Sequence, residues 1–293
     1  MINFRFHLVS IAAVLIALAA GIALGSGPLD DAGDALSGSD VASSGTTDPA
    51  VRAFETGYAG RTGGALLKDQ LKGQSVVVLT TPGASSAEVR GVSGDLTDAG
   101  ATVTGEVALT SKLLSSSSRQ FAEGVAQQSA ADVDGVKTAG DSYGRIGAAL
   151  ARSLMGDSAA GADSTATTIR SAFTEGDLVT VTKQPKRLAT LAVLVTGPQR
   201  SGGSEQSTVI AALAGALNRS GKGVVVAGPS SSSTDGGAVK AVRDGEAGSE
   251  ISTVDVTDSA AGRIVTALAA AQQVKGRPGA WGTSRSAGGA VPR

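Results

Sequence analysis

An unbroken apolar segment near the amino terminus constrains how the rest of the chain can fold. Residues 8–24 are apolar apart from one serine and one glycine; Arg5 precedes them, and Asp30 and Asp31 follow. A helix needs about 17–25 apolar residues to cross the hydrocarbon core of a bilayer, and positive charge stays on the cytoplasmic side. We therefore expect residues 1–25 to be a signal anchor: a single transmembrane helix with a cytoplasmic amino terminus and an extracytoplasmic main domain.

A cleaved signal peptide is the alternative interpretation of this segment. The apolar part of such a peptide usually spans about 7–15 residues and ends at a small-x-small site, which Ala-Leu-Gly at 23–25 provides. The chain has no cysteine, so it has no lipobox. Under both interpretations the remaining residues function in the cell envelope, and the cytoplasmic membrane is the first expected partner.

The composition excludes most catalytic and metal-binding chemistries. The only histidine, His7, precedes the apolar segment, and apart from the initiator the only methionine is Met155. The outer domain therefore lacks Ser/His/Asp triads, Cys/His pairs and the soft ligands that Cu(I) prefers. The formal net charge of −1 gives no electrostatic reason to bind nucleic acid. We predict no enzyme activity, no cofactor and no metal site.

Two pairs of carboxylates could still be considered for a hard cation. Asp132 and Asp134 are close in sequence, as are Asp255 and Asp258. Such pairs are more typical of solvated or helix-capping residues, and Asp258 is positioned to cap the last helix.

Apolar runs alternate with amphipathic segments, and this pattern predicts the fold. Continuous apolar runs are typical of strands that are covered on both faces of a parallel sheet. Strands are expected at 75–80, 101–109, 191–196, 222–228 and 251–256, and helices at 51–71, 86–98, 204–219, 236–245 and 261–274. Ser85 and Glu88 have capping-box spacing. The sequence thus predicts an α/β domain of three layers with a mainly parallel sheet.

The same pattern suggests a division of the chain into segments. Residues 26–72 are expected to form a flexible stalk with a short helix, 73–274 the α/β domain, and 275–293 a glycine-rich tail. The domain could consist of two βαβ lobes, 73–110 and 188–274, joined by a helical insert at 111–187. Core candidates in the insert are Phe121, Val125, Ile146, Leu150, Leu154 and Phe173.

The carboxyl ends of the predicted strands are where a binding site is expected. In doubly wound sheets, ligands gather in the crevice beyond these ends. There the sequence places Thr81, Pro82, Gly197, Pro198 and Ser231, the last within the loop 228–234. Their hydroxyls, backbone amides and small side chains suit a protein edge or peptide. Trp281 in the tail is a candidate aromatic anchor for the same partner.

Several segments, taken in order, carry a resemblance to a known family. They are Ala-Gly-Ile-Ala-Leu-Gly-Ser-Gly at 20–27, Leu-Lys-Gly-Gln-Ser-Val-Val-Val-Leu-Thr-Thr-Pro-Gly-Ala at 71–84, Val-Val-Val-Ala-Gly at 224–228, Ile-Ser-Thr-Val-Asp at 251–255, Gly-Arg at 262–263, Gly-Ala-Trp-Gly-Thr at 279–283 and Val-Pro at 291–292. In this order and spacing the chain resembles the actinobacterial MctB family, which is named for mycobacterial copper transport and includes SteB-like proteins of cell separation.

The resemblance implies a role in copper transport or homeostasis, or alternatively a SteB-like scaffold that regulates cell separation and peptidoglycan machinery without handling copper. A single apolar span cannot enclose a pore, so we expect a non-catalytic protein that binds an envelope or membrane partner and can assemble as a homo-oligomer. Many relatives have a coiled coil after the anchor, whereas residues 28–72 here lack sustained heptads.

Overall fold

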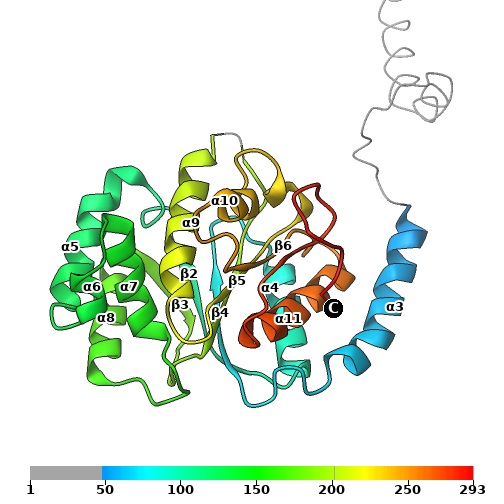
Figure 1. The fold of residues 1–293 in the computed structure, drawn as a ribbon, viewed down its shortest axis with the longest axis horizontal. Helices are drawn as coiled ribbons and strands as arrows, with labels where there is room; N and C mark the ends of the chain where they lie inside the picture. Colours follow the sequence, from blue (N-terminus) through cyan, green and yellow to red (C-terminus); the bar gives the residue numbers. More distant parts are fainter. Residues whose placement is uncertain (1–47, 201, 293) are drawn as a thin grey trace, which may run out of the picture. The chain divides into compact units, whose positions relative to one another are not determined.

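The computed structural model describes residues 48–200 and 202–292, which form one compact unit from Pro49 onward. The helices are α3 (Pro49–Leu67), α4 (Ser86–Asp98), α5 (Arg119–Ser129), α6 (Asp134–Lys137), α7 (Ser142–Leu154), α8 (Ser164–Glu175), α9 (Ser204–Asn218), α10 (Ala238–Asp244) and α11 (Ala260–Val274), with 3₁₀ turns η1 (Ser116–Ser118) and η2 (Ser230–Ser233). The strands are β1 (Ser75–Thr80), β2 (Thr102–Leu109), β3 (Val179–Lys183), β4 (Leu191–Val195), β5 (Val224–Ala227), β6 (Ser252–Val254) and β7 (Ala280–Trp281) (Figure 1).

All seven strands belong to a single sheet, in the order β3-β2-β1-β4-β5-β6-β7. Every neighbouring pair is parallel except β2 and β3, which are antiparallel. The first strands of the two predicted βαβ blocks lie side by side, with Val76 opposite Leu191 and Val78 opposite Val193. The mainly parallel sheet of the sequence analysis is therefore confirmed, and both blocks contribute to it.

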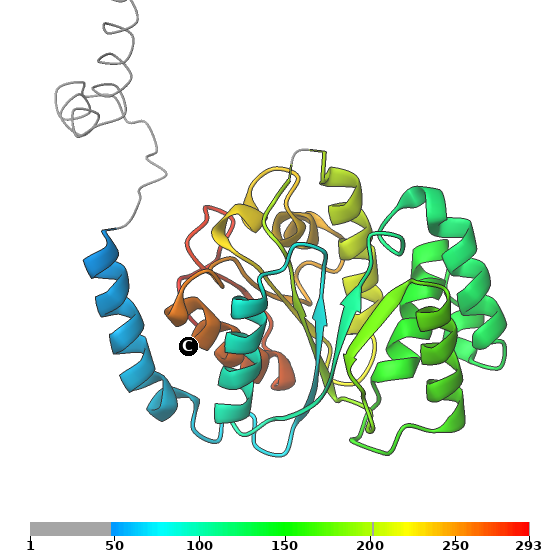
Figure 2. The same cartoon turned by 180° about the vertical axis from the view of Figure 1, so that it is seen from behind.

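Helices cover both faces of the sheet, which explains the continuous apolar runs. Val77 and Leu79 belong to one core together with α7, α9 and α10. Val76 and Val78 point to the other core, which contains α3, α4 and α11. Alternate residues of a strand point to opposite faces, so each residue of these strands faces a core. Figure 2 shows the sheet between the two helical layers.

The ends of the helices follow local capping chemistry. Ser85 accepts a hydrogen bond from the backbone N–H of Glu88, as its spacing predicts. The cap expected from Asp258 is wrong: Ser259 occupies the N-cap of α11, because its backbone is extended and its Oγ accepts from the N–H of Gly262 at 2.9 Å. The Asp258 carboxylate instead accepts hydrogen bonds from the N–H and hydroxyl of Ser230.

The insert between β2 and β4 contains four helices and also the unpredicted edge strand β3. Ile146, Leu150, Leu154 and Phe173 are buried there as expected, and Val125 packs against the same core. Phe121 is a correction, since it is 47% exposed. The ammonium of Lys112 lies 4.3 Å from its ring centroid, so a cation–π contact takes the place of burial.

The amino-terminal predictions fall mostly outside the described residues. The expected anchor at 1–25 and the stalk up to residue 47 lie there. Among the helices of the described ranges, none combines the length and apolarity that a membrane span requires. The predicted helix at 51–71 corresponds to α3, and the tail expected at 275–293 adds β7 to the sheet.

Candidate functional site

The carboxyl ends of β1 and β4 meet at the point where the direction of the sheet's connections changes. The chain leaves β1 toward α4 on one face, and it leaves β4 toward α9 on the other. Such a switch point opens a crevice beyond the strand ends, because the two connections diverge. Four of the residues predicted to contact a partner follow these two strands: Thr81, Pro82, Gly197 and Pro198.

Two of the predicted residues are in direct contact at this point. The backbone N–H of Gly197 donates to Oγ1 of Thr81 at 3.1 Å, and the N–H of Thr81 donates to the carbonyl of Val195 at 3.1 Å. A Cβ added to Gly197 would lie 2.7 Å from the carbonyl carbon of Gly83. Only glycine therefore allows the two strand-end turns to approach this closely.

A small pocket lies above this contact. Four predicted residues line it, and they are Thr81, Pro82, Gly197 and Pro198. Further lining comes from the following turn, the first half of α9 and neighbouring loops, namely Leu114, Gln199, Arg200, Gly203, Gln206, Ser207, Ile210, Gly236 and Ala238. Hydroxyls, amides and apolar surface dominate, and no carboxylate lines the pocket. Groups of these kinds can hydrogen-bond to a peptide backbone and contact apolar side chains.

Arg200 is the charged residue of the pocket, and it was not predicted from the sequence. Gly83 has a φ of 85°, and a Cβ added there would lie 2.6 Å from Nη2 of Arg200. The guanidinium therefore lies against the turn that follows β1. Its position after the Thr-Gly-Pro turn of β4 is a signal that could have identified it.

The other two predicted residues lie elsewhere. Ser231 belongs to η2 beyond β5, and Trp281 lies in β7 at the edge of the sheet; neither lines the pocket. The hydroxyls around Ser231 are used within the turn: Ser232 donates to the carbonyl of Pro229, and Ser233 to that of Ser230. The loop 228–234 is therefore closed on itself by its own hydrogen bonds.

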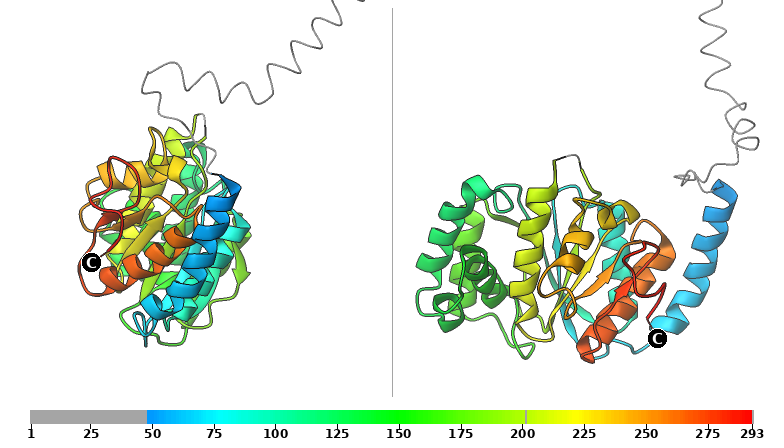
Figure 3. Two further views of the ribbon diagram at one scale, coloured as in Figure 1. Left: turned by 90° about the vertical axis from the view of Figure 1, so that its right-hand side faces the viewer. Right: turned by 45° about the horizontal axis from the view of Figure 1, so that its top comes forward.

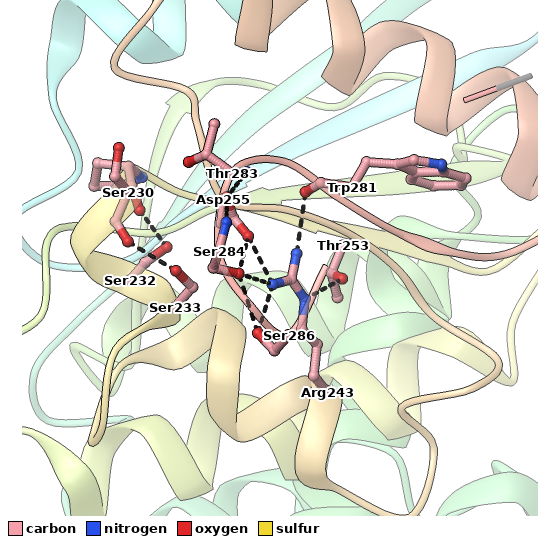
Figure 4. A network of polar contacts seen from close by, with 11 residues as sticks. Ser230, Ser232, Ser233, Arg243, Thr253, Asp255, Trp281, Thr283, Ser284 and Ser286 are labelled. Atoms are coloured by element: carbon pink, nitrogen blue, oxygen red, sulfur yellow. Dashed lines mark hydrogen bonds and ion pairs between the residues drawn. The ribbon is translucent and has the colours of Figure 1, made fainter. Parts of the chain in front are cut away.

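A buried ion pair joins the carboxyl-terminal residues to the sheet, and sequence reasoning missed it. Nη1 of Arg243 lies 2.7 Å from Oδ2 of Asp255, and the two side chains are 5% and 0% exposed. Arg243 also donates to hydroxyls of Thr253, Ser284 and Ser286 and to the carbonyl of Trp281. In Figure 4 the guanidinium lies at the centre of these groups, while the indole ring points away.

The carboxylate of Asp255 is fully used by this network. It accepts from the N–H of Thr283 at 2.8 Å and from the hydroxyl of Ser284 at 2.6 Å. Burial alone would raise the pKa of Asp255, but the hydrogen bonds from Ser284, Thr283 and Arg243 outweigh it and hold the pKa below its usual range. The pair Asp255 and Asp258 is thus structural. Within the described ranges, no three His, Cys, Asp or Glu side chains are grouped closely enough to hold a metal ion.

A second groove lies between α3, α4 and α11, on the other face of the sheet. Gly60 and Gly63 of α3, Asp95 and Asp98 of α4, and Arg263 of α11 are among its lining residues. Burial raises the pKa of Asp95 to about 6, although the charge of Arg263 opposes this shift. The groove therefore contains a carboxyl group that titrates near neutral pH.

Comparison with known proteins agrees with the resemblance seen in the sequence. The family model described as "Copper transport outer membrane protein, MctB" matches residues 1–292. The protein named Copper transporter MctB from Mycobacterium tuberculosis (strain ATCC 25618 / H37Rv) is 31% identical over 311 residues, covering 98% of each chain. Its namesake from Mycobacterium leprae (strain TN) is 31% identical with 92% of each chain covered. The chain therefore belongs to the MctB family.

Proposed function

We propose that this protein acts in copper homeostasis in the cell envelope, as a non-catalytic component that binds a protein partner at the pocket between β1 and β4. Relatives at 31% identity over almost the whole chain are named copper transporters, which supports the copper role. The apolar segment 8–24 supports a membrane tether, with the domain on the extracytoplasmic side.

The observation that carries the proposal is the convergence of Thr81, Pro82, Gly197 and Pro198 on one pocket. Two turns separated by more than a hundred residues form it, and its surface offers amide groups, hydroxyls and two prolines. These groups recognise backbone and apolar side chains. The copper role is then indirect, because Met155 is buried and the chain has no cysteine, so soft ligands for Cu(I) are lacking.

Photocrosslinking in living cells tests the partner site. A photoreactive amino acid at Pro82 or Pro198 should capture the same partner. Matched controls replace Ser231 and Trp281, which lie on the same rim but outside the pocket, and Lys222 at the amino-terminal edge of the sheet. Capture from Lys222 alone, or from none of the positions, would contradict a site between β1 and β4.

Copper itself is tested with Pro198→Glu in a strain that lacks the wild-type gene. Pro198 is exposed, so the variant should fold and the cells should become sensitive to copper. A SteB-like scaffold is the second candidate, because a site without metal ligands suits a regulator of cell separation equally well. Cells that fail to separate yet tolerate copper normally would favour that scaffold over the copper role.

A further inference from the structure

Helix α3 packs closely on α11, and a groove is left open between these two helices and α4. In Figure 3 α3 lies alongside α11, and a Cβ added to Gly63 would lie 2.6 Å from Cδ1 of Ile264. Gly60 and Gly64 also line the groove, but a Cβ added to either would meet no atom within 4 Å. The groove has a volume of about 220 Å³. Because a water molecule takes up about 30 Å³ in the liquid, the groove has room for a molecule of several non-hydrogen atoms.

Charges of both signs line this groove. Asp95 and Asp98 lie one turn apart on α4, and Arg263 comes from the first turn of α11. The stem of Arg263 lies against Gly91, one turn before Asp95, since a Cβ added to Gly91 would lie 2.5 Å from Cδ of the arginine. Nη1 of Arg263 donates to the carbonyl of Thr257 at 3.4 Å. The guanidinium is thus positioned close to the two carboxylates, although it belongs to another helix.

These opposite charges do not satisfy one another. Among the residues that the structure describes, Arg263, Asp95 and Asp98 form no ion pair, and the carboxyl group of Asp95 accepts no hydrogen bond. Burial raises the pKa of Asp95 to about 6, and the charge of Arg263 lowers it only in part. A half-buried carboxylate without a donor is unfavourable. A ligand that brings a donor to Asp95 would therefore be stabilised in the groove.

We propose that the groove binds a small α-amino acid, whose ammonium group contacts Asp95 and Asp98 and whose carboxylate contacts Arg263. An ammonium group has three donors for the two carboxylates, and a guanidinium can donate two parallel hydrogen bonds to one carboxylate. An α-amino acid carries both of its charges on one carbon, so it can reach both signs of charge in a single small groove. Its side chain would contact the apolar lining residues, which are Ala59, Leu67 and Ile264.

The mixed charges argue against ligands that carry only one sign. A metal cation or a simple amine would be attracted by Asp95 and Asp98 but repelled by Arg263, whose guanidinium would stay unused. A simple carboxylic acid would be attracted by Arg263 but repelled by the two aspartates. A zwitterion avoids both repulsions, and it supplies the donor that Asp95 lacks.

Isothermal titration calorimetry of the full-length protein in detergent tests this assignment, above neutral pH where Asp95 is ionised. Alanine is the probe, and it should bind at one site per chain. N-acetylalanine lacks the ammonium group and alaninamide lacks the carboxylate, so each should bind at least about tenfold more weakly than alanine. These comparisons use the wild-type chain, so they do not depend on whether a variant folds.

Variants then locate the site. Asp95→Asn and Arg263→Gln should each weaken alanine binding at least about tenfold, and Gly60→Leu should abolish it by filling the groove. Arg90→Gln is the matched control, because Arg90 is exposed on α4 and does not line the groove; it should bind like the wild type.

Three results would overturn the proposal. They are the absence of alanine binding to the wild type, equal binding of alanine and either analogue, and binding that Gly60→Leu leaves unchanged while its urea midpoint shows a folded domain. The proposal is independent of the pocket between β1 and β4, so Pro198→Glu should bind alanine normally.

Discussion

Replacing Arg243 with methionine should destabilise the domain more than any replacement of an exposed charge. Methionine keeps the length and the apolar stem of the side chain but removes the guanidinium. Asp255, whose side chain is 0% exposed, would then be left as a buried carboxylate without its counter-charge. Removing one partner of such a pair typically costs about 3–5 kcal/mol. That is a large part of the roughly 5–15 kcal/mol by which a domain is stable.

The same helix offers a matched control. Lys240 of α10 pairs with Asp244 at 2.8 Å, but the two side chains are 32% and 60% exposed. Solvent screens such exposed pairs, so Lys240→Met should leave the free energy of unfolding close to that of the wild type. A combined Arg243→Met and Asp255→Leu variant should recover only part of the loss, since the N–H of Thr283 would then lack its acceptor.

Urea unfolding provides the assay, with two signals. The fluorescence of Trp281, the only tryptophan, reports on the carboxyl-terminal residues, because Arg243 donates to its carbonyl at 3.1 Å. Far-ultraviolet circular dichroism reports on the whole domain. For Arg243→Met we expect both midpoints to fall, with fluorescence changing first if the tail detaches. Equal midpoints for Arg243→Met and the wild type, or equal losses for Arg243→Met and Lys240→Met, would refute the reasoning.

Acid should act on the same network. The pKa of Asp255 lies below its usual value in the folded protein, so the ionised form stabilises the native state. This stabilisation is complete above the unfolded pKa of about 3.9 and is lost as pH falls through the lower folded pKa. Arg243→Met should therefore show less additional destabilisation on acidification than the wild type.

Three further predictions concern the core, the groove and copper. Val77→Asp or Val225→Asp, both fully buried, should prevent folding because an unpaired buried charge costs several kcal/mol, whereas Thr180→Asp on exposed β3 should melt like wild type. Because burial raises the pKa of Asp95 to about 6, its protonated form stabilises the folded state, and this stabilisation is lost as the pH rises from about 4 to 6. The loss should be about 1.5 kcal/mol after halving for solvent screening. The urea midpoint of Asp95→Asn should not show this fall. Residues 49–293, with Met155 buried, should not compete with a chromogenic chelator for Cu(I), and stoichiometric sub-nanomolar binding would contradict the indirect role.

The central strands and the pocket could be predicted because each depends on a local pattern. A run such as 75–80 is apolar at nearly every position, and only a strand covered on both faces needs that. Parallel strands have their carboxyl ends at one edge, so Thr81 and Gly197 were expected on one rim. That they share a hydrogen bond depends on β1 and β4 being neighbours, which the sequence did not determine.

The edges of the sheet could not be predicted, because they depend on tertiary contacts. Only Val179 of β3 is buried, Val181 is half-buried and the other three residues are exposed, and β7 has two residues in a glycine-rich segment. Arg243 was not singled out in the sequence, and Asp255 was expected to be a solvated or helix-capping residue, because their pairing requires α10 and β6 to pack together. Asp258 and Ser259 are both competent caps, and backbone geometry at the start of α11 decided between them.

The carboxyl ends of the strands form one edge of the sheet, and the two halves of this edge differ in how accessible they are to a partner. Beyond β6 and β7 the rim is closed: Asp255 is saturated by hydrogen bonds, and Gly282, with a φ of 137°, approaches it so closely that no side chain would fit. A partner could reach that half only if the tail detached. Beyond β1 and β4 the pocket is open without any movement. Stability and partner capture should therefore separate: Arg243→Met should lose stability, whereas Pro198→Glu should lose partner capture while its urea midpoint stays unchanged.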